Sequence, residues 1–574
     1  MLTIRKLAHK FALPLWPWYL CGCLFLAATN RITVEIPQLI KEIVNKIGAQ
    51  PPDALSSVAI AIIALGCLQF LSRSISRISI FWPGRALEAT SKTWLFSKTM
   101  KLPQKFFLEY GMGDLISRLS NDLGQIRVFF AFGILQLLNM LFILWFTVSK
   151  MLEVHSNLTW IALIPIAAML IVTRFIMPKM QKYARQSQEA VGKLTNKVTE
   201  AFVNVHVIQS HAAENAFIKK AEAENYKVFV ANMKNVIIRT LFFPLMTTLT
   251  GISQLIVLYY GGSQVMDGNL TVGDIVAFNI YLTYMAFPLT SLGIILSIYQ
   301  RTKTAVERIS PIYEEDEEYE EQEKPPIQPG NDAPLLEIKN LSYSYPKSSD
   351  HPNPKEVLSD ISFTINHSKK IGLFGSVGSG KSTLFNLITK IYSPPPGTVF
   401  LNGVDILKIP HQELRQEIGY TLQTAQLFSA SVEQNILFGH SSDLTDDSLK
   451  KAAREAQILD DIERLAQGWK TEIGERGVRL SGGQKQRLAL ARLFLRNPQM
   501  FLLDDVLSAV DNITEKNLIH NLYKKNKAAI IASHRVSVLE QCDEVIVIEN
   551  GTIKDRGTWQ DLKIKWMPTA GDKN

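Results

Sequence analysis

Six long apolar segments run through the first half of the chain, and each is long enough to cross a membrane as a helix. A helix rises about 1.5 Å per residue, so about 20 apolar residues span the hydrocarbon of a bilayer. The third segment contains no charged residue, and neither Lys nor Arg occurs between Arg239 and Arg301. We therefore expect membrane helices near residues 13–28, 54–71, 128–149, 158–172, 242–260 and 272–298.

Positive charge differs sharply between the connections of these helices. The segments joining helices two to three and four to five are rich in Lys and Arg, whereas residues 50–53, 151–157 and 261–271 contain neither. Because Lys and Arg near span ends stay on the cytosolic side, the pattern predicts a multi-pass protein of the cytoplasmic membrane with both termini in the cytosol. Buried helices of a soluble protein have no reason to sort charge in this way. Three residues run against the rule: Arg31, Lys41 and Lys46.

The two basic connections have a helical pattern, so the membrane helices are expected to extend well below the bilayer. In the first connection, residues 113–122 are predicted to form a short amphipathic helix bounded by turn residues. We interpret it as a docking helix that receives movement from another domain, with a solvated turn as the alternative. Gln136, Gln254 and Asn279 lie within spans, where single polar residues more often bridge neighbouring helices than line a cavity.

Composition agrees with a partly membrane-embedded chain of more than one domain. Of the 574 residues 47% are hydrophobic and 20% are charged, and this length exceeds what one core normally organises. The net charge of +8 does not indicate nucleic acid, because Lys and Arg cluster beside apolar segments rather than on one folded surface. Four cysteines without paired spacing support neither a zinc site nor a disulfide framework. The basic N-terminus resembles a signal peptide, but the segment continues too far and is predicted to be a retained first helix.

An acidic stretch with paired prolines separates two parts of different texture. Acid runs and paired prolines rarely pack into a core, so residues 311–333 are predicted to be a solvated linker. Residues 1–310 before it form the predicted transmembrane domain. After it, short β-branched runs broken by turns predict a second domain over residues 334–574.

A strand-like run at residues 370–374 ends in a loop that fits GxxxxGK[ST], and a helical pattern follows. This is the context that the phosphate-binding motif requires. Glycines let backbone N–H groups converge on phosphate oxygens, Lys381 adds a cation, and Ser382 offers a hydroxyl to Mg²⁺. The sequence therefore predicts an α-helical six-span transmembrane domain plus an α/β P-loop nucleotide-binding domain that uses ATP and Mg²⁺. The predicted nucleotide contacts here are Gly375, Ser376, Val377, Gly378, Ser379, Gly380, Lys381, Ser382 and Thr383.

Two other strand-like runs end in residues suited to ATP hydrolysis. Residues 500–503 lead into Asp504, a predicted Mg²⁺ ligand, and Asp505, which is placed to orient an attacking water. Residues 529–532 lead to His534, which is placed to contact the γ-phosphate. Taken alone, His534 is more often an ordinary loop residue.

A second glycine-containing segment precedes the helical run at residues 485–495 and makes another helix N-terminus able to bind phosphate. One nucleotide does not need two such cradles in one domain. We therefore expect this segment to bind a nucleotide held by a partner domain, which makes ATP part of a dimer interface. Its residues are Leu480, Ser481, Gly482, Gly483 and Gln484.

With these motifs in this order, the chain resembles ATP-binding-cassette exporters over nearly its whole length. The resemblance implies that Tyr345 stacks on adenine and that Gln423 links Mg²⁺ to the membrane half and takes part in catalysis. It also implies that residues 471–477 touch docking helices, that residues 508–511 cross between paired ATPases, and that residues 113–122 dock. Its partners would be a second half-transporter, the lipid bilayer and a hydrophobic small molecule.

The chain departs from that family at Asp505, where glutamate is usual. Aspartate is one methylene shorter, and a displacement of about 1 Å can cost on the order of a hundredfold in rate. Asp505 combined with an intact segment Leu480–Gln484 resembles one half of heterodimeric bacterial multidrug exporters, in which the other half carries the catalytic glutamate. A homodimeric exporter of lipid or peptide, and an ATP-gated membrane regulator without transport, remain alternatives.

Overall fold

The structure, a computed structural model, describes residues 3–46, 52–317, 333–345, 356–440, 445–474 and 480–566. It divides into two compact units. The first takes in the chain up to Met100 together with Gly113–Glu315, and the second takes in Lys101–Met112 together with the chain from Asp316 onward. Residues 318–332 of the predicted linker lie outside the described residues, and its first residues continue a helix that ends at Glu314.

The first unit is helical throughout its described residues. The six predicted spans fall within six helices that are long and apolar enough to cross a membrane, which confirms the predicted transmembrane fold. In chain order the elements are α1 (Ile4–Leu7), η1 (Ala8–Ala12), η2 (Leu13–Leu15), α2 (Trp16–Lys46), α3 (Pro52–Thr99), α5 (Met112–Ser117), η3 (Arg118–Asp122), α6 (Leu123–Val128), η4 (Phe129–Gly133), α7 (Ile134–Val154), α8 (Ser156–Val203), α9 (Val205–Ser210), α10 (Glu214–Met266) and α11 (Val272–Glu314).

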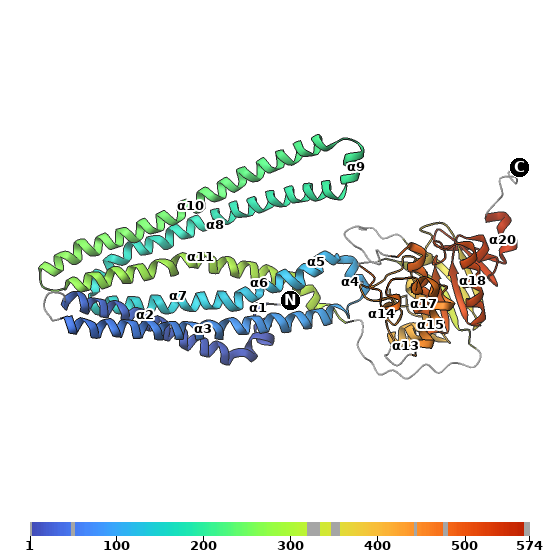
Figure 1. Ribbon diagram of the computed structural model, residues 1–574, viewed down its shortest axis with the longest axis horizontal. Helices are drawn as coiled ribbons and strands as arrows, with labels where there is room; N and C mark the ends of the chain where they lie inside the picture. Colours follow the sequence, from blue (N-terminus) through green and yellow to red (C-terminus); the bar gives the residue numbers. More distant parts are fainter. Residues whose placement is uncertain are drawn as a thin grey trace. The chain divides into compact units, whose positions relative to one another are not determined.

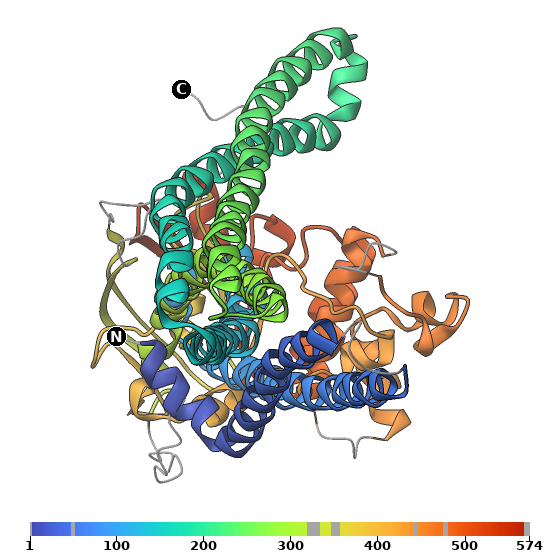
Figure 2. The same ribbon diagram turned by 90° about the vertical axis from the view of Figure 1, so that its left-hand side faces the viewer.

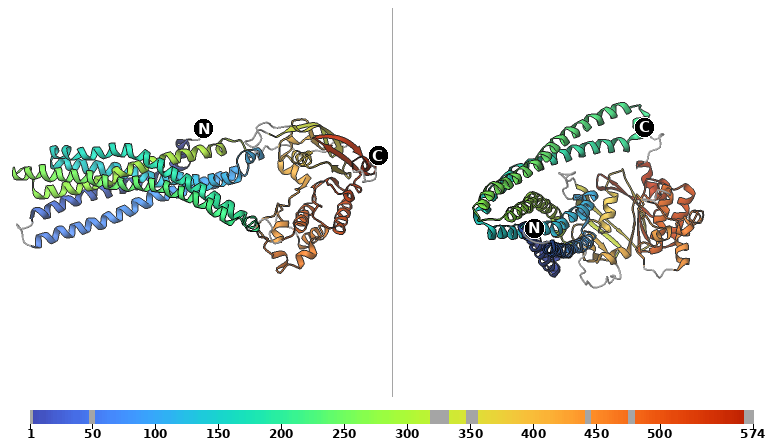
Figure 3. Two further views of the ribbon diagram at one scale, coloured as in Figure 1. Left: turned by 90° about the horizontal axis from the view of Figure 1, so that it is seen from above. Right: turned by 60° about the vertical axis from the view of Figure 1, so that its left-hand side comes forward.

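The long helices of this unit pack as pairs. Helices α8 and α10 run side by side and are joined at one end by α9, where the hairpin extends away from the other helices (Figures 1 and 2). Helices α2 and α3 form a second pair, drawn in blue in Figure 3. The expected bridging role holds for Gln254, whose amide donates to Thr283 of α11 at 3.3 Å, while Asn279 bonds to the Ile275 carbonyl of its own helix.

A group of charged residues joins the beginning of α5 and η3 to the end of α11. Arg118 is buried, with 6% of the residue exposed, and its side chain donates to Asp114 at 2.7 Å and to the carbonyl of Arg308 at 2.6 Å. Arg308 in turn pairs with Asp114 and, at 2.9 Å, with Asp122. Because each buried charge has an opposite charge beside it, this network holds the two helix ends together.

The prediction of a separate short helix at residues 113–122 is wrong, whereas the docking role proposed for this segment stays a prediction. These residues begin the continuous helix Met112–Val154, because no proline or turn interrupts its backbone hydrogen bonds before the third span. The short helix of this connection is α4 (Gln104–Glu109), which follows Pro103 and ends before Gly111. It belongs to the second unit, where Leu102 and Phe106 are each 3% exposed and Gln104 hydrogen-bonds Tyr392.

The second unit is an α/β domain with two sheets, as predicted. One sheet is antiparallel in the order β2-β1-β4-β5, and the other has the order β10-β9-β3-β8-β7-β6, with β9, β3, β8, β7 and β6 parallel. The strands are β1 (Leu336–Ser344), β2 (Glu356–Ile365), β3 (Lys370–Phe374), β4 (Val399–Leu401), β5 (Val404–Asp405), β6 (Ile418–Thr421), β7 (Met500–Asp504), β8 (Ala528–Ala532), β9 (Glu544–Glu549) and β10 (Thr552–Gly557).

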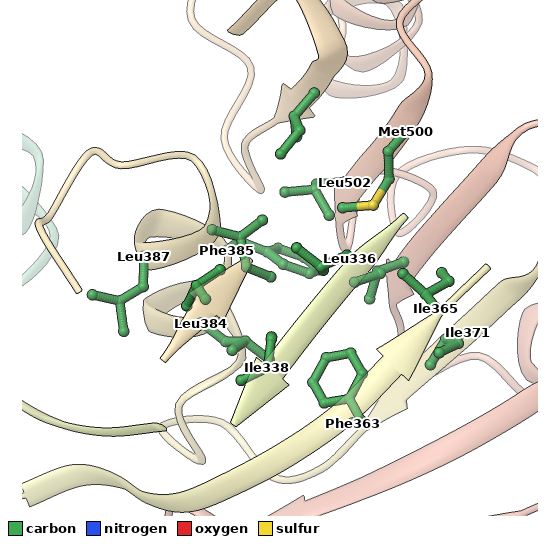
Figure 4. Close-up of a cluster of buried hydrophobic side chains, with 14 of the residues drawn as sticks. Leu336, Ile338, Phe363, Ile365, Ile371, Leu384, Phe385, Leu387, Met500 and Leu502 are labelled. Atoms are coloured by element: carbon green, nitrogen blue, oxygen red, sulfur yellow. The ribbon is translucent and has the colours of Figure 1, made fainter. Parts of the chain in front are cut away.

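Helices cover the parallel sheet, so β7 and β8 are buried along their whole length, as such strands require. Figure 4 shows Leu384 and Phe385 of α12 gathered with Leu336 of β1 and Leu502 of β7. This packing fixes the helix that follows the phosphate loop. The helices are α12 (Lys381–Ile388), η5 (Ile406–Lys408), α13 (His411–Glu417), α14 (Val432–Ile436), α15 (Asp446–Glu455), α16 (Leu459–Glu463), η6 (Gly468–Lys470), α17 (Gly482–Arg496), α18 (Asn512–Lys524), α19 (Val536–Leu539) and α20 (Trp559–Trp566).

The buried imidazole of His411 gives the second unit a pH-dependent stability. Burial, with the positive charges of Lys390 and Arg415, lowers the pKa of His411 from 6.5 to about 4. Between these two values the unfolded chain binds a proton that the folded protein does not, so stability falls as pH falls from 6.5 toward 4. Thermal unfolding of the His411→Gln variant should show a smaller loss of stability between pH 6.5 and 4 than the native protein shows. The variant His367→Gln, at an exposed position, should lose as much stability over this pH range as the native protein.

Candidate functional site

Most of the predicted phosphate, metal and catalytic residues line one cavity of about 250 Å³ in the second unit. The loop after β3 contributes one wall, and the ends of β7 and β8 with the segment after β6 contribute the rest. The predicted residues that line it are Val377, Gly378, Ser379, Gly380, Lys381, Ser382, Thr383, Gln423, Asp504, Asp505 and His534.

The glycine-rich loop is shaped by close packing that side chains would prevent. A Cβ on Gly375 would lie 2.1 Å from the Ile548 carbonyl oxygen, and Gly380 has a left-handed φ of 105° and would place a Cβ 2.5 Å from Leu358. The Lys381 ammonium donates to the Gly375 and Ser376 carbonyls at 2.6 and 2.9 Å. Burial lowers the pKa of Lys381, and the nearby Asp504 and Asp505 carboxylates oppose that change. The loop therefore presents backbone N–H groups and one cation to the cavity at the start of α12.

Asp504 ends β7 and is 4% exposed. Its carboxylate accepts hydrogen bonds from Ser382 and, at 3.5 Å, from the Tyr420 hydroxyl. Burial raises the pKa of Asp504, and the Ser382 hydroxyl and Lys381 charge oppose the rise. A buried carboxylate bonded to the serine of the phosphate loop is an oxygen-rich arrangement of the kind that Mg²⁺ prefers.

Asp505 follows at a left-handed φ of 49°, a conformation that aspartate tolerates better than most residues. Its backbone N–H donates to the Ala532 carbonyl at 3.0 Å, which fixes it between β7 and the end of β8. Burial raises the pKa of Asp505, while the neighbouring His534 lowers it. His534 is itself exposed and lies edge-on to the Phe374 ring, 6.2 Å between centroids. A carboxylate and an imidazole that interact electrostatically thus line the same cavity as the loop.

Tyr345 reaches the same region without lining the cavity. Its hydroxyl and that of Thr383 lie 3.0 Å apart, and its ring is edge-on to Tyr392 and Tyr343. Gln423 lies after β6 and also borders a second hollow of about 670 Å³, lined in part by Gly482, Gln486 and Ala509. The structure thus places Tyr345 beside the start of α12 and Gln423 between two hollows.

The segment Leu480–Gln484 lies apart from the first cavity, as the prediction of a partner nucleotide requires. Ser481 caps α17: its hydroxyl accepts from the Gln484 N–H at 3.2 Å, and the Gln484 side chain accepts from the Ser481 N–H at 3.0 Å. The pattern S-x-x-Q before a helix is a known capping signature, so this role was available from the sequence. Gln484 also donates to Asp461 at 2.9 Å.

Arg535 and Glu515, which the motifs did not identify, connect the end of β8 to the Ser508–Val510 loop that follows β7. Arg535 directly follows His534 and donates to the carbonyls of Ser508 and Val510 at 2.7 and 3.0 Å. Glu515 is 1% exposed and holds the same guanidinium. The sequence signal for this clamp is weak, because Glu515 stands in an ordinary helical pattern.

The loop that Arg535 holds packs directly against α17. The Ala509 N–H donates to Gln486 at 3.2 Å, and a Cβ on Gly483 would lie 2.6 Å from the Ala509 carbonyl oxygen. His534, Arg535, the Ser508–Val510 loop and the start of α17 therefore form one connected path. Residues 475–477 of the predicted exporter loop lie outside the described residues.

Replacing Arg535 by Ala should loosen the Ser508–Val510 loop, because Glu515 would be left as an unpaired buried charge. Breaking such a pair costs about 3–5 kcal/mol. Amide hydrogen exchange should be faster at residues 508–511. Thermal unfolding should show a lower unfolding temperature of the ATPase unit. Lys563→Ala, which removes an exposed pair with Glu540, is the matched control and should change neither. Unchanged exchange in Arg535→Ala would show that the clamp does not hold the loop.

Comparison with known proteins agrees with this geometry. Residues 19–289 match the family model "ABC transporter transmembrane region", and residues 358–508 match "ABC transporter". The chain is 32% identical to the probable multidrug resistance ABC transporter ATP-binding/permease protein YheI of Bacillus subtilis, over 98% of this chain and 96% of that protein. It is 28% identical to the multidrug resistance-like ATP-binding protein MdlA of Escherichia coli, over 94% of this chain and 91% of that protein.

A solved structure of a bacterial Atm1-family ABC exporter with ATP bound shares the fold. Its TM-score is 0.79 at 23% identity, over 95% of this chain and 96% of that chain. The six apolar helices, the phosphate loop and these matches lead to one conclusion: the chain belongs to the ABC transporter family, as an ATP-driven, multidrug-resistance-like exporter half that dimerises with another ABC half.

Proposed function

We propose that this chain is one half of a heterodimeric exporter of hydrophobic or amphipathic compounds, and that its own ATP site is slow. The observation that carries the proposal is Asp505, which stands at the end of β7 beside His534 where the family usually has glutamate. The segment Leu480–Gln484, by contrast, is complete. This chain then binds ATP at its own loop and supplies Ser481 and its neighbours to the faster site of the partner.

The cavity chemistry supports ATP binding at the chain's own loop. Lys381 and the N-terminus of α12 suit phosphate, and Tyr345 lies beside Thr383 where its ring suits stacking on adenine. The residues that would hold Mg²⁺ are Ser382, Asp504 and Gln423, all of them oxygen donors on the same cavity. When bound, the ion would neutralise phosphate charge.

A partner is also supported by the free end of the α8–α10 hairpin. Phe202, Val203 and Val207 are 73%, 76% and 58% exposed there. An exposed apolar group at the tip of a long helical hairpin is suited to pack against a second half-transporter. The names of the relatives, which describe multidrug resistance, support an exported compound of apolar character, and the loop charges support cytosolic termini in the cytoplasmic membrane.

Two substitutions in this chain separate the two ATP sites of the dimer. Co-expressed with its partner half and reconstituted, Asp505→Asn should lower total ATPase activity by less than about twofold, since one slow site is lost. Ser481→Ala should lower it by about 10²-fold or more, because it removes a donor to the transferring phosphate at the fast site. Ser431→Ala is the matched control, because Ser431 makes the same capping box with Gln434 at α14.

Equal and near-complete loss in Asp505→Asn and Ser481→Ala would show two equivalent sites and favour a homodimer. ATP binding without movement of any compound, with any partner, would favour a membrane regulator instead. If Ser431→Ala lowered activity as much as Ser481→Ala, loss of a helix cap would explain both results.

Lengthening the side chain at position 505 tests the geometric cause directly. With the partner's catalytic glutamate replaced by Gln, Asp505→Glu should raise the residual hydrolysis rate by about tenfold or more, because the carboxylate regains about 1 Å of reach. Single-turnover hydrolysis is the measurement, and Asp561→Glu on the exposed surface is the control. An unchanged rate would place the limitation elsewhere than at the attacking water.

A further inference from the structure

Two arginines, Arg73 and Arg77, lie one turn apart on α3, just past the apolar stretch predicted as the second span. Hydropathy alone assigns them to the end of that span. Contacts with neighbouring helices place them deeper. The Ser72 hydroxyl accepts from Thr29 of α2 at 3.0 Å, and the next residue of α2, Asn30, bonds to Asn139 of α7 at 3.1 Å.

Asn139 fixes the depth, because it stands midway along the charge-free stretch 128–149 of the third span. Arg73 of α3 therefore lies level with the middle of the third span, and Arg77 is about 6 Å further along α3. Arg73 also acts electrostatically on the hydroxyl of Tyr284, which lies near the middle of the stretch 272–298 of α11. Two independent helices thus give the same depth.

The arginines face neighbouring helices rather than the apolar outer side of α3. Gln69, Arg73 and Arg77 are four residues apart and share one face. Gln69 donates to Thr33 of α2 at 2.7 Å. On the same side of α3, Gly84 packs against Ala131, and a Cβ on Gly84 would lie only 2.8 Å from the Ala131 Cβ. Three exposed apolar residues of this region occupy the opposite face of α3: Leu71, Ile75 and Ile78. Phe70 and Phe81, which are also exposed, border the arginine face.

Both side chains are exposed, and within the described part of the chain neither guanidinium forms an ion pair or hydrogen bond. An arginine at the centre of a membrane helix costs about 2.5–3.5 kcal/mol on insertion scales. Ionisable residues at this depth almost always face a bundle interior and mark a substrate or ion pathway. A pair of unpartnered guanidinium groups is suited to an anion, since each donates several fixed hydrogen bonds to carboxylate or phosphate oxygens.

We propose that Arg73 and Arg77 bind the anionic group of the exported compound, so that the cargo is an amphipathic anion: a carboxylate, sulfonate or phosphate on an apolar body. Tyr284 and Gln69 lie beside this site and add polar contacts. The inference rests on the proposed function as an exporter of amphipathic compounds. It adds the sign of the cargo's charge and the place on α3 where that charge binds.

Two dyes with the same xanthene ring system test the charge of the cargo. The chain and its partner half are reconstituted in phosphatidylcholine vesicles, and ATP-driven uptake of anionic carboxyfluorescein is compared with that of cationic rhodamine 6G. The double variant Arg73→Gln/Arg77→Gln should lose at least about tenfold of carboxyfluorescein uptake, the loss expected for one charge-assisted hydrogen bond, and retain any rhodamine uptake. Arg73→Lys/Arg77→Lys should keep most of the uptake because the charge remains.

Arg301→Gln is the matched control: it removes an exposed arginine of α11 that lies outside the proposed site, and both dyes should be taken up as by the native protein. Rhodamine uptake that exceeds carboxyfluorescein uptake and is unchanged in the double variant would overturn the inference. Equal loss of both dyes, with loss of co-purification with the partner, would show that the arginines pair with partner carboxylates and would also overturn it. Failure to transport any dye in the native complex, or any other amphipath, would instead contradict the proposed function.

Discussion

The parallel pairing of β3, β8 and β7 is the constraint on which the ATP site depends. Leu373 and Asp504 both pair with Ala532, so the three strands end at the same edge of the sheet. The phosphate loop, the two aspartates and the Ser533–His534 turn follow those ends and must therefore meet. Because β7 and β8 are buried along their whole length, this register cannot shift without moving apolar side chains out of the core.

Features encoded over a few adjacent residues were predictable, whereas features made by distant residues were not. The loop Gly375–Ser382 and the strand before it specify a phosphate site through local backbone requirements, and charge-free stretches specify membrane helices through length. The short helix of the first connection was misplaced because amphipathic periodicity continues from Met112 into the third span, whereas Pro103 and Gly111 bound the short helix α4. Arg73 fell outside the predicted second span, residues 54–71, because hydropathy measures one helix at a time, whereas the depth of a residue is set by its neighbours on other helices.

The clamp of Arg535 and Glu515 connects the chain's own cavity to the start of α17. His534 lies on the chain's own cavity, and the adjacent Arg535 holds the loop against which Gly483 and Gln486 pack. A change at His534 would thus reach the capped start of α17, which we propose serves the nucleotide of the partner. Such a connection lets a site that hydrolyses slowly still influence its neighbour through ATP binding.

The assignment of α4 to the second unit has a consequence for how this protein is handled in parts. The ATPase is assembled from two separate pieces of chain, and Leu102, Gln104 and Phe106 belong to it although they lie more than two hundred residues before β1 in sequence. A fragment that begins after the linker would lack this piece and leave its binding groove, including Tyr392, Arg415 and Tyr420, open to water. Residues 101–112, supplied in trans or by fusion, would cover this groove again.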